Sequence, residues 1–121
     1  MPVIIVYGIP RKTNQKKLKA LCDDLRAATA AVKELELVAD QVSCFFPSDM
    51  MSAGLGEEII IYVDSLLKKP DRTPDVRDAL AAALVTTVRA FFPETALIEC
   101  FVHPVSRDDI GFSTFSKEVS T

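Results

Sequence analysis

The sequence contains no tryptophan, one histidine, four glycines and three cysteines in 121 residues. The cysteines are widely spaced at Cys22, Cys44 and Cys100, and no CxxC pair exists. Together with the single His103 they cannot complete a zinc site, so we expect neither a metal nor a cofactor. An odd number of cysteines among apolar neighbours is typical of reduced, buried thiols in the cytosol.

Long apolar runs are also missing, because none approaches the roughly 20 residues that a membrane-spanning helix needs. No basic leader precedes an apolar segment, so we expect neither membrane insertion nor secretion. The net charge of −3 and the pI near 5.1 argue against nucleic acid or an anionic membrane as the main partner. These features favour a cytoplasmic protein.

Hydrophobic residues are plentiful, at 49% of the chain, with a mean hydropathy of +0.21. A single small domain has too little interior to bury so many apolar side chains. We therefore expect one domain spanning residues 1–121 that buries apolar surface against copies of itself.

The chain repeats itself. The apolar run 4–7 recurs as 59–63, and Lys12-Thr13 recurs as Arg72-Thr73 before a second segment with apolar residues spaced by threes and fours. Each predicted helix is followed by a predicted strand, at 42–46 and at 97–102, and we align Cys44 with Cys100. The pattern predicts two β-α-β units, a pseudo-repeat of residues 2–56 and 57–115.

Two such units predict an α/β fold with a four-stranded mixed sheet and two helices on one face. The crossover helix makes the two strands of each unit parallel. No third helix is available for the other face of the sheet, and self-association would cover it. We also expect the tail segment Phe112–Phe115 to form a short strand or turn against a neighbouring subunit, and Ser116–Thr121 to fray.

Pro2 follows Met1 directly and opens the first apolar run. A small second residue allows Met1 to be removed, which would leave a rigid secondary amine at the start of a buried strand. Desolvation and nearby cations lower the pKa of such an amine, so that it can act as a general base near neutral pH. The plainer interpretation is a proline that simply begins a strand, where its missing N–H costs nothing.

The terminal proline, the tandem β-α-β units and a cation before each Thr-capped helix together resemble the tautomerase superfamily. This group includes 4-oxalocrotonate tautomerase, macrophage migration inhibitory factor and 5-carboxymethyl-2-hydroxymuconate isomerase. The resemblance covers roughly Pro2 to Phe115. It implies a homotrimer with the proline in a pocket at the subunit boundary, acting on a small carboxylate such as an enolisable 2-oxo acid.

The resemblance also implies roles for individual residues. Pro2 would be the general base, and a cation at Arg11 or Lys12 would bind the substrate carboxylate and stabilise a developing enolate. Arg72 is the second-half counterpart of that cation. Leu55 and Ile110 would form the hydrophobic wall.

Two departures from the family pattern leave alternatives open. The second arginine of the short tautomerases is replaced by Ser43 or Cys44 here, and we expect its second-half equivalent to be Glu99. One alternative is therefore a trimer that binds a metabolite or a protein without catalysis. Another is hydration or dehalogenation, in which Glu99 activates a water. For His103 we favour a structural role.

Overall fold

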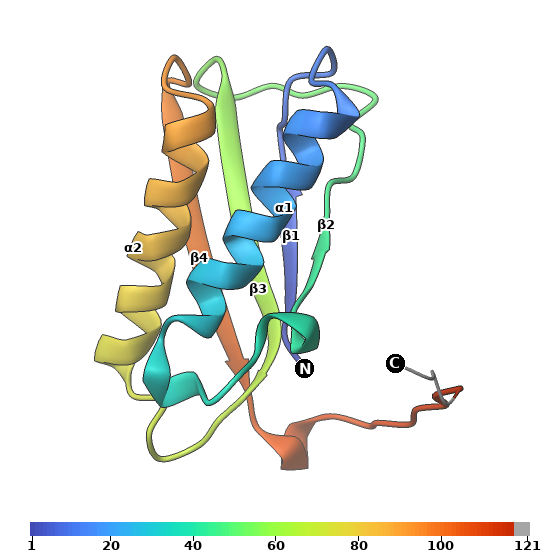
Figure 1. Cartoon of the computed structure of the whole chain (residues 1–121), viewed down its shortest axis with the longest axis vertical. Coiled ribbons are helices and arrows are strands. Elements are labelled where there is room, and N and C mark those ends of the chain that lie inside the picture. The colour runs from blue at the N-terminus through green and yellow to red at the C-terminus, as the bar shows by residue number, and fades with distance from the viewer. Residues whose placement is uncertain (118–121) are drawn as a thin grey trace.

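The computed structural model describes residues 1–117 and contains one four-stranded sheet in the order β2-β1-β3-β4 (Figure 1). Its elements are β1 (Val3–Tyr7), α1 (Gln15–Ala30), β2 (Ser43–Phe45), β3 (Glu58–Leu67), α2 (Pro74–Phe91) and β4 (Leu97–Val105), with short 3-10 turns at Lys33–Leu35, Ala39–Gln41 and Arg107–Asp109. Strands β1 and β2 run parallel, β3 and β4 run parallel, and β1 pairs antiparallel with β3. The predicted tandem β-α-β repeat and mixed sheet are confirmed.

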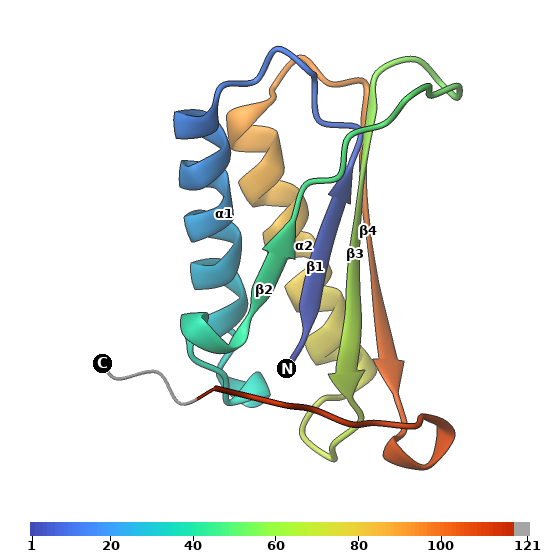
Figure 2. The ribbon, with the colours of Figure 1, turned by 90° about the vertical axis from the view of Figure 1, so that its right-hand side faces the viewer.

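Both helices lie side by side on one face of the sheet (Figures 1 and 2). Alternate side chains of β1 and β3 point into the layer between sheet and helices. The fully buried core there comprises Ile4, Val6, Leu21, Leu25, Leu35, Ile59, Ile61, Val63, Leu80, Leu84 and Val88. None of the helices within residues 1–117 is long and apolar enough to cross a membrane.

The two helices begin with side-chain caps of the same type. The Asn14 side chain accepts a hydrogen bond from Lys17 N–H, and Thr73 accepts one from Val76 N–H. We expected Thr13 to cap the first helix, but the cap is the next residue, Asn14. The Thr13 hydroxyl instead donates a hydrogen bond to the Pro10 carbonyl (2.6 Å).

The helix cores repeat as predicted. Leu21 and Leu80 lie at the same position after their caps, and both are fully buried. Leu25 and Leu84 match in the same way. The buried faces of the two helices are therefore equivalent, and these faces meet the sheet.

The strand that follows each helix repeats in a different register from the one expected. Ile4 pairs with Cys44, whereas the equivalent Ile59 pairs with Ile98. The repeat therefore relates Cys44 to Ile98, and aligning Cys44 with Cys100 was wrong. For the same reason Glu99 is not the equivalent of Ser43 or Cys44.

The second face of the sheet carries a row of large apolar side chains. In register, Phe45 lies beside Ile5, Ile5 beside Tyr62, and Tyr62 beside Phe101. The Tyr62 and Phe101 rings stack with their centroids 5.6 Å apart. Phe45 is 59% exposed and Phe101 43% exposed. Within residues 1–117 no helix or strand lies over this open face (Figure 2), which confirms the predicted uncovered surface.

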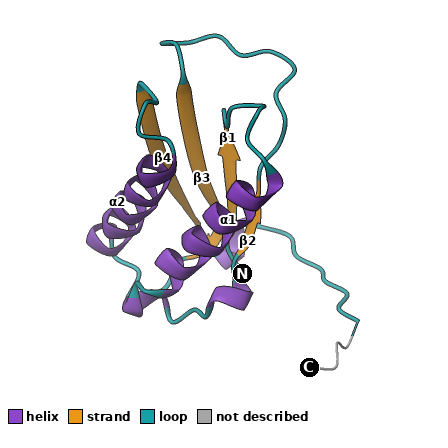
Figure 3. Ribbon diagram, turned by 45° about the horizontal axis from the view of Figure 1, so that its top comes forward, coloured by secondary structure: helices purple, strands orange, loops and turns teal. Residues whose placement is uncertain are grey.

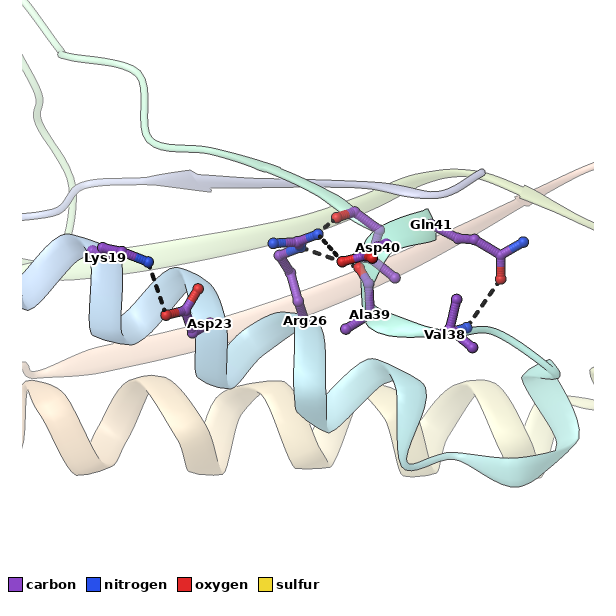
Figure 4. Close-up of polar contacts among 8 residues, drawn as sticks. Lys19, Asp23, Arg26, Val38, Ala39, Asp40 and Gln41 are labelled. Carbon is purple, nitrogen blue, oxygen red and sulfur yellow. Dashed lines mark hydrogen bonds and ion pairs between the residues drawn. The ribbon is translucent and has the colours of Figure 1, made fainter. Parts of the chain in front are cut away.

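Hydrogen bonds fasten the connection between α1 and β2 to the helix (Figure 4). Arg26 Nε donates to the Ala39 carbonyl (3.1 Å) and to the Val42 carbonyl (2.8 Å), and the Gln41 side chain accepts from Val38 N–H (3.0 Å). The Arg26 contacts hold residues 39–42 against α1.

Two longer segments extend from the body of the molecule. The loop between β2 and β3 projects beyond one end of the sheet, and the tail after β4 leaves from the other end (Figure 3). In the single chain Phe112–Phe115 forms neither strand nor turn, and Phe115 is 91% exposed. Its packing against a neighbouring subunit stays a prediction. Of the segment 116–121 that we expected to fray, residues 118–121 lie outside the described part of the chain.

Candidate functional site

Pro2 is buried directly before β1, where its carbonyl accepts a hydrogen bond from Ser43 N–H (3.2 Å). A proline fits this place because the position needs no backbone donor. A pocket of about 180 Å³ opens beside it. Its lining includes Met1, Pro2, Glu36, Gln41, Ser65, Lys69 and Arg72. Pro2 and Arg72, two of the residues expected at the site, both line this pocket within one chain.

Arg72 immediately precedes the cap of α2 and is only 6% exposed. Its Nη1 donates to the Leu67 carbonyl and its Nη2 to the Leu35 carbonyl, each at 2.8 Å. The third guanidinium nitrogen, Nε, is buried without a hydrogen-bond partner among the described residues. No carboxylate of residues 1–117 forms an ion pair with this guanidinium.

A buried cation with an unused donor is costly unless an anion compensates it. The two carbonyl oxygens hold the guanidinium in place but do not neutralise its charge. Lys69 adds a second cation to the pocket lining, against the single carboxylate of Glu36. The Pro2 pocket is therefore positive overall and suits a small anion.

Backbone strain is concentrated around the same pocket. Glu36 (φ 54°) and Ser65 (φ 64°) are the non-glycine residues of the described chain with positive φ, and both line it. Such conformations cost on the order of 1–3 kcal/mol each and persist where the surrounding structure imposes them. Ser65 lies within the irregularity of the β3–β4 register between Val63 and Leu66. We found no signal in the sequence for either residue.

Arg11 and Lys12 lie at the opposite end of the sheet from Pro2, in the loop that joins β1 to α1 (Figure 1). Arg11 Nη2 donates a hydrogen bond to the Asp49 carbonyl. Arg11 also lines two cavities at that end of the sheet. Lys12 is exposed and lines neither these two cavities nor the Pro2 pocket. One chain therefore brings Arg72, but neither Arg11 nor Lys12, to Pro2.

The expected wall residues do not line the Pro2 pocket of the single chain. Leu55 is 78% exposed in the loop before β3, at the Arg11 end. Ile110 is 37% exposed and follows the 3-10 turn after β4, at the Pro2 end. Both remain predictions for an assembled protein.

Glu99 and His103 both lie on the open face of the sheet rather than in the Pro2 pocket. Glu99 pairs with Ile60 towards the Arg11 end of β4. His103 Nδ1 lies 3.4 Å from Asp64 Oδ1, and its ring lies 5.6 Å from that of Tyr62. The carboxylate that does line the Pro2 pocket is Glu36.

Cys44 and Cys100 are poor nucleophiles. Burial raises the pKa of Cys44 to about 12, and the neighbouring Cys22 thiol adds to the shift. Burial alone raises the pKa of Cys100 to about 12. Because the thiolate is the reactive form, these side chains stay protonated and unreactive near neutral pH.

No protein family model and no curated protein sequence matches the chain. Solved structures match it well. A fused 4-OT, described as a wild-type asymmetric trimer, is 19% identical with a TM-score of 0.70, and 91% of each chain is covered. Macrophage migration inhibitory factor of Toxoplasma gondii is 16% identical with a TM-score of 0.67, covering 91% of this chain and 95% of that one.

A third structure is a member of the cis-3-chloroacrylic acid dehalogenase family. It is 14% identical with a TM-score of 0.67, and the match covers 91% of this chain and 79% of that one. At such identities the likeness concerns the arrangement of the backbone. The chain therefore has the fold of the tautomerase superfamily.

Proposed function

We propose that this chain is an isomerase of the tautomerase type, in which Pro2 is the general base once Met1 has been removed. The observation that carries the proposal is the shared pocket of Pro2 and Arg72. Pro2, whose ring nitrogen can become an amine, and the buried Arg72 guanidinium both line this pocket. The Arg72 Nε–H has no partner among the described residues. A small enolisable 2-oxo acid supplies an anion for the Arg72 guanidinium and a proton that a base at Pro2 can move.

The chemistry follows from the two groups. While Met1 is attached, Pro2 nitrogen is an amide and cannot accept a proton. After its removal, burial and the cations Lys69 and Arg72 favour the neutral amine, so we expect its pKa below the ordinary α-amino range of about 7.7–8.0. The amine takes the enol O–H proton and returns a proton to carbon, while Arg72 Nε–H holds the carboxylate.

Assembly would complete the site. The solved relative described above is a trimer, and the open face with Phe45, Tyr62 and Phe101 offers an apolar surface for such contacts. We propose a homotrimer in which Arg11 or Lys12 of a neighbouring subunit approaches Pro2. Leu55 or Ile110 of a neighbouring subunit would form the hydrophobic wall of the pocket. The three free cysteines favour a reducing, cytosolic location.

Glu36 gives the alternative activity a specific residue. Hydration needs a carboxylate that activates water, and Glu36 lines the Pro2 pocket whereas Glu99 does not. If the protein hydrates an unsaturated acid, Glu36→Gln should abolish that reaction and leave enol-to-keto conversion measurable. Equal loss of both would mean that Glu36 only shapes the pocket.

The deciding experiment compares Met-free protein with a form that retains Met1. Both share the fold, but only the first has a basic nitrogen at Pro2. We expect the Met-free form to convert the enol of a 2-oxo acid to its keto form about 10²–10⁴-fold faster, the usual contribution of a positioned base. Equal rates, or no reaction in either form, would contradict catalysis and favour the non-catalytic binding protein.

A further inference from the structure

The end of the sheet opposite Pro2 carries two adjoining cavities. The larger has a volume of about 520 Å³ and the smaller about 220 Å³. They meet at Ile9, Pro10, Arg11 and Asp49, which line both. The larger volume lies within the range of about 300–1,000 Å³ that is usual for small-molecule sites.

The internal repeat relates this end of the sheet to the Pro2 end. Glu57 carbonyl accepts a hydrogen bond from Leu97 N–H (3.3 Å), as the Pro2 carbonyl does from Ser43 N–H (3.2 Å). Glu57 therefore occupies the place of Pro2 in the second half, and it lines the smaller cavity. In the second half the side chain at this position is a carboxylate, whereas the first half has the potential amine of Pro2. The group offered to a ligand here is therefore an anion.

The charges around these cavities are not paired with one another. Neither Arg11 nor Glu57 forms an ion pair within residues 1–117. The Asp49 carbonyl takes one donor of Arg11, which leaves other guanidinium donors for a ligand. The neighbouring Glu58 carboxylate is less available, because it accepts from Leu55 N–H (3.4 Å) and holds the loop.

The larger cavity is apolar on one side. Leu18 on α1 and Phe46 after β2 line it together with Ile9, and Ile9 and Phe46 pack against the core. An apolar group that enters there would lie beside Arg11, which borders both cavities. A ligand that fills both would therefore present an apolar group, an anion and a cation in that order.

We propose that this second site binds a free α-amino acid with an apolar side chain. Its carboxylate binds Arg11, its ammonium group binds Glu57, and its side chain enters between Leu18 and Phe46. Each charged contact is a charge-assisted hydrogen bond, which is stronger than a neutral one. Within one chain the site shares no residue with the Pro2 pocket.

The test is an NMR titration of the Met1-retaining protein, in which the Pro2 nitrogen is an amide. L-leucine should shift the backbone resonances around Arg11 and Glu57. Two analogues each lack one charged group: 3-methylbutylamine has no carboxylate and 4-methylpentanoic acid has no ammonium group. Each should bind about 10–100-fold more weakly than leucine, the range expected for one lost hydrogen bond to a charged group.

Variants complete the test. Arg11→Gln and Glu57→Gln should each weaken leucine binding by about the same 10–100-fold. Lys16→Gln, which removes an exposed charge from α1 outside both cavities, should leave it unchanged. The proposal is overturned if leucine causes no shifts at millimolar concentration, or if either analogue binds as tightly as leucine. It is equally overturned if the Arg11 and Glu57 variants bind leucine as the unmodified protein does.

Discussion

Replacing Arg72 with methionine keeps an unbranched apolar stem in the fold and removes the guanidinium group. Two hydrogen bonds of 2.8 Å, to the Leu67 and Leu35 carbonyls, are lost at a side chain that is 6% exposed. Each is worth about 1.5–3 kcal/mol because the donor is charged. Relief from burying an uncompensated charge offsets part of this loss, so we expect the free energy of unfolding to fall by about 2–4 kcal/mol.

Arg77→Met is the matched control. Arg77 also donates to a backbone carbonyl, that of Arg72 (2.8 Å), but it does not line the Pro2 pocket. We expect a smaller loss, about 1–2 kcal/mol, because one hydrogen bond disappears from a partly exposed side chain.

Urea denaturation with and without pyruvate separates stability from anion binding. A ligand at 100 times its dissociation constant stabilises the folded state by about 2.7 kcal/mol. The unmodified protein and Arg77→Met should show this gain, and Arg72→Met should not. Protein concentration must be held fixed, since an oligomer's stability depends on it. If Arg72→Met gains as much from pyruvate as the unmodified protein, the unpartnered Nε is not the anion site.

The core, the open face and the thiols give three more expectations. Leu21→Ala and Leu80→Ala, at matching fully buried positions, should each lower the free energy of unfolding by about 2–5 kcal/mol in urea denaturation. A loss well under 1 kcal/mol at either (about a third of the usual effect) would contradict their shared role. Tyr62→Glu on the open face should reduce the mass in light scattering from three chains to one chain of 13.3 kDa; a variant that stays trimeric would exclude this face as the interface. Burial raises the pKa of Cys44 and Cys100 to about 12, above the unfolded value of about 8.5. Their contribution to stability is therefore complete below about pH 8.5 and is lost as the pH rises towards 12. A variant with both cysteines changed to alanine should show a flatter decline between pH 9 and pH 11 (roughly the window between those two values), and an unchanged slope would contradict this reasoning.

The sequence was sufficient for the architecture because apolar spacing determines which faces are buried. A spacing of threes and fours places Leu21 and Leu25 on one side of α1, and the same rhythm places Leu80 and Leu84 on one side of α2. Two β-α-β units with only two helices leave one face of the sheet uncovered. The open face follows from this count of elements without knowledge of any contact.

The register of β4 could not be predicted from the same pattern. A slip of two residues keeps every side chain on its own face of a strand, so the alternation of apolar and polar residues is unchanged. Aligning Cys44 with Cys100 therefore preserves the pattern while giving the wrong partner. The two registers are distinguished only when Ile4 is matched with Ile59 and their partners, Cys44 and Ile98, are compared.

The candidate site was predictable in part. Pro2 and Arg72 could be named because each belongs to a sequence pattern, a terminal proline and a cation before a helix cap. Glu36, Ser65 and Lys69 could not, because loops distant in sequence bring them to the pocket only after folding. Arg11 is close to Pro2 in sequence, yet β1 separates them by about 3.3 Å for each of its residues.

The antiparallel pairing of β1 with β3 explains why the two ends of the sheet differ. It places the start of each half beside the helix entry of the other half. Pro2, which begins the first half, meets Arg72 from the second, and Glu57, which begins the second, shares a cavity with Arg11 from the first. Each pocket thus draws its strand-start group and its cation from different halves. In a protein built from two identical chains, a change at one site would alter the other as well. Duplication within one chain removes that constraint, so an amine at one end and a carboxylate at the other can serve different ligands.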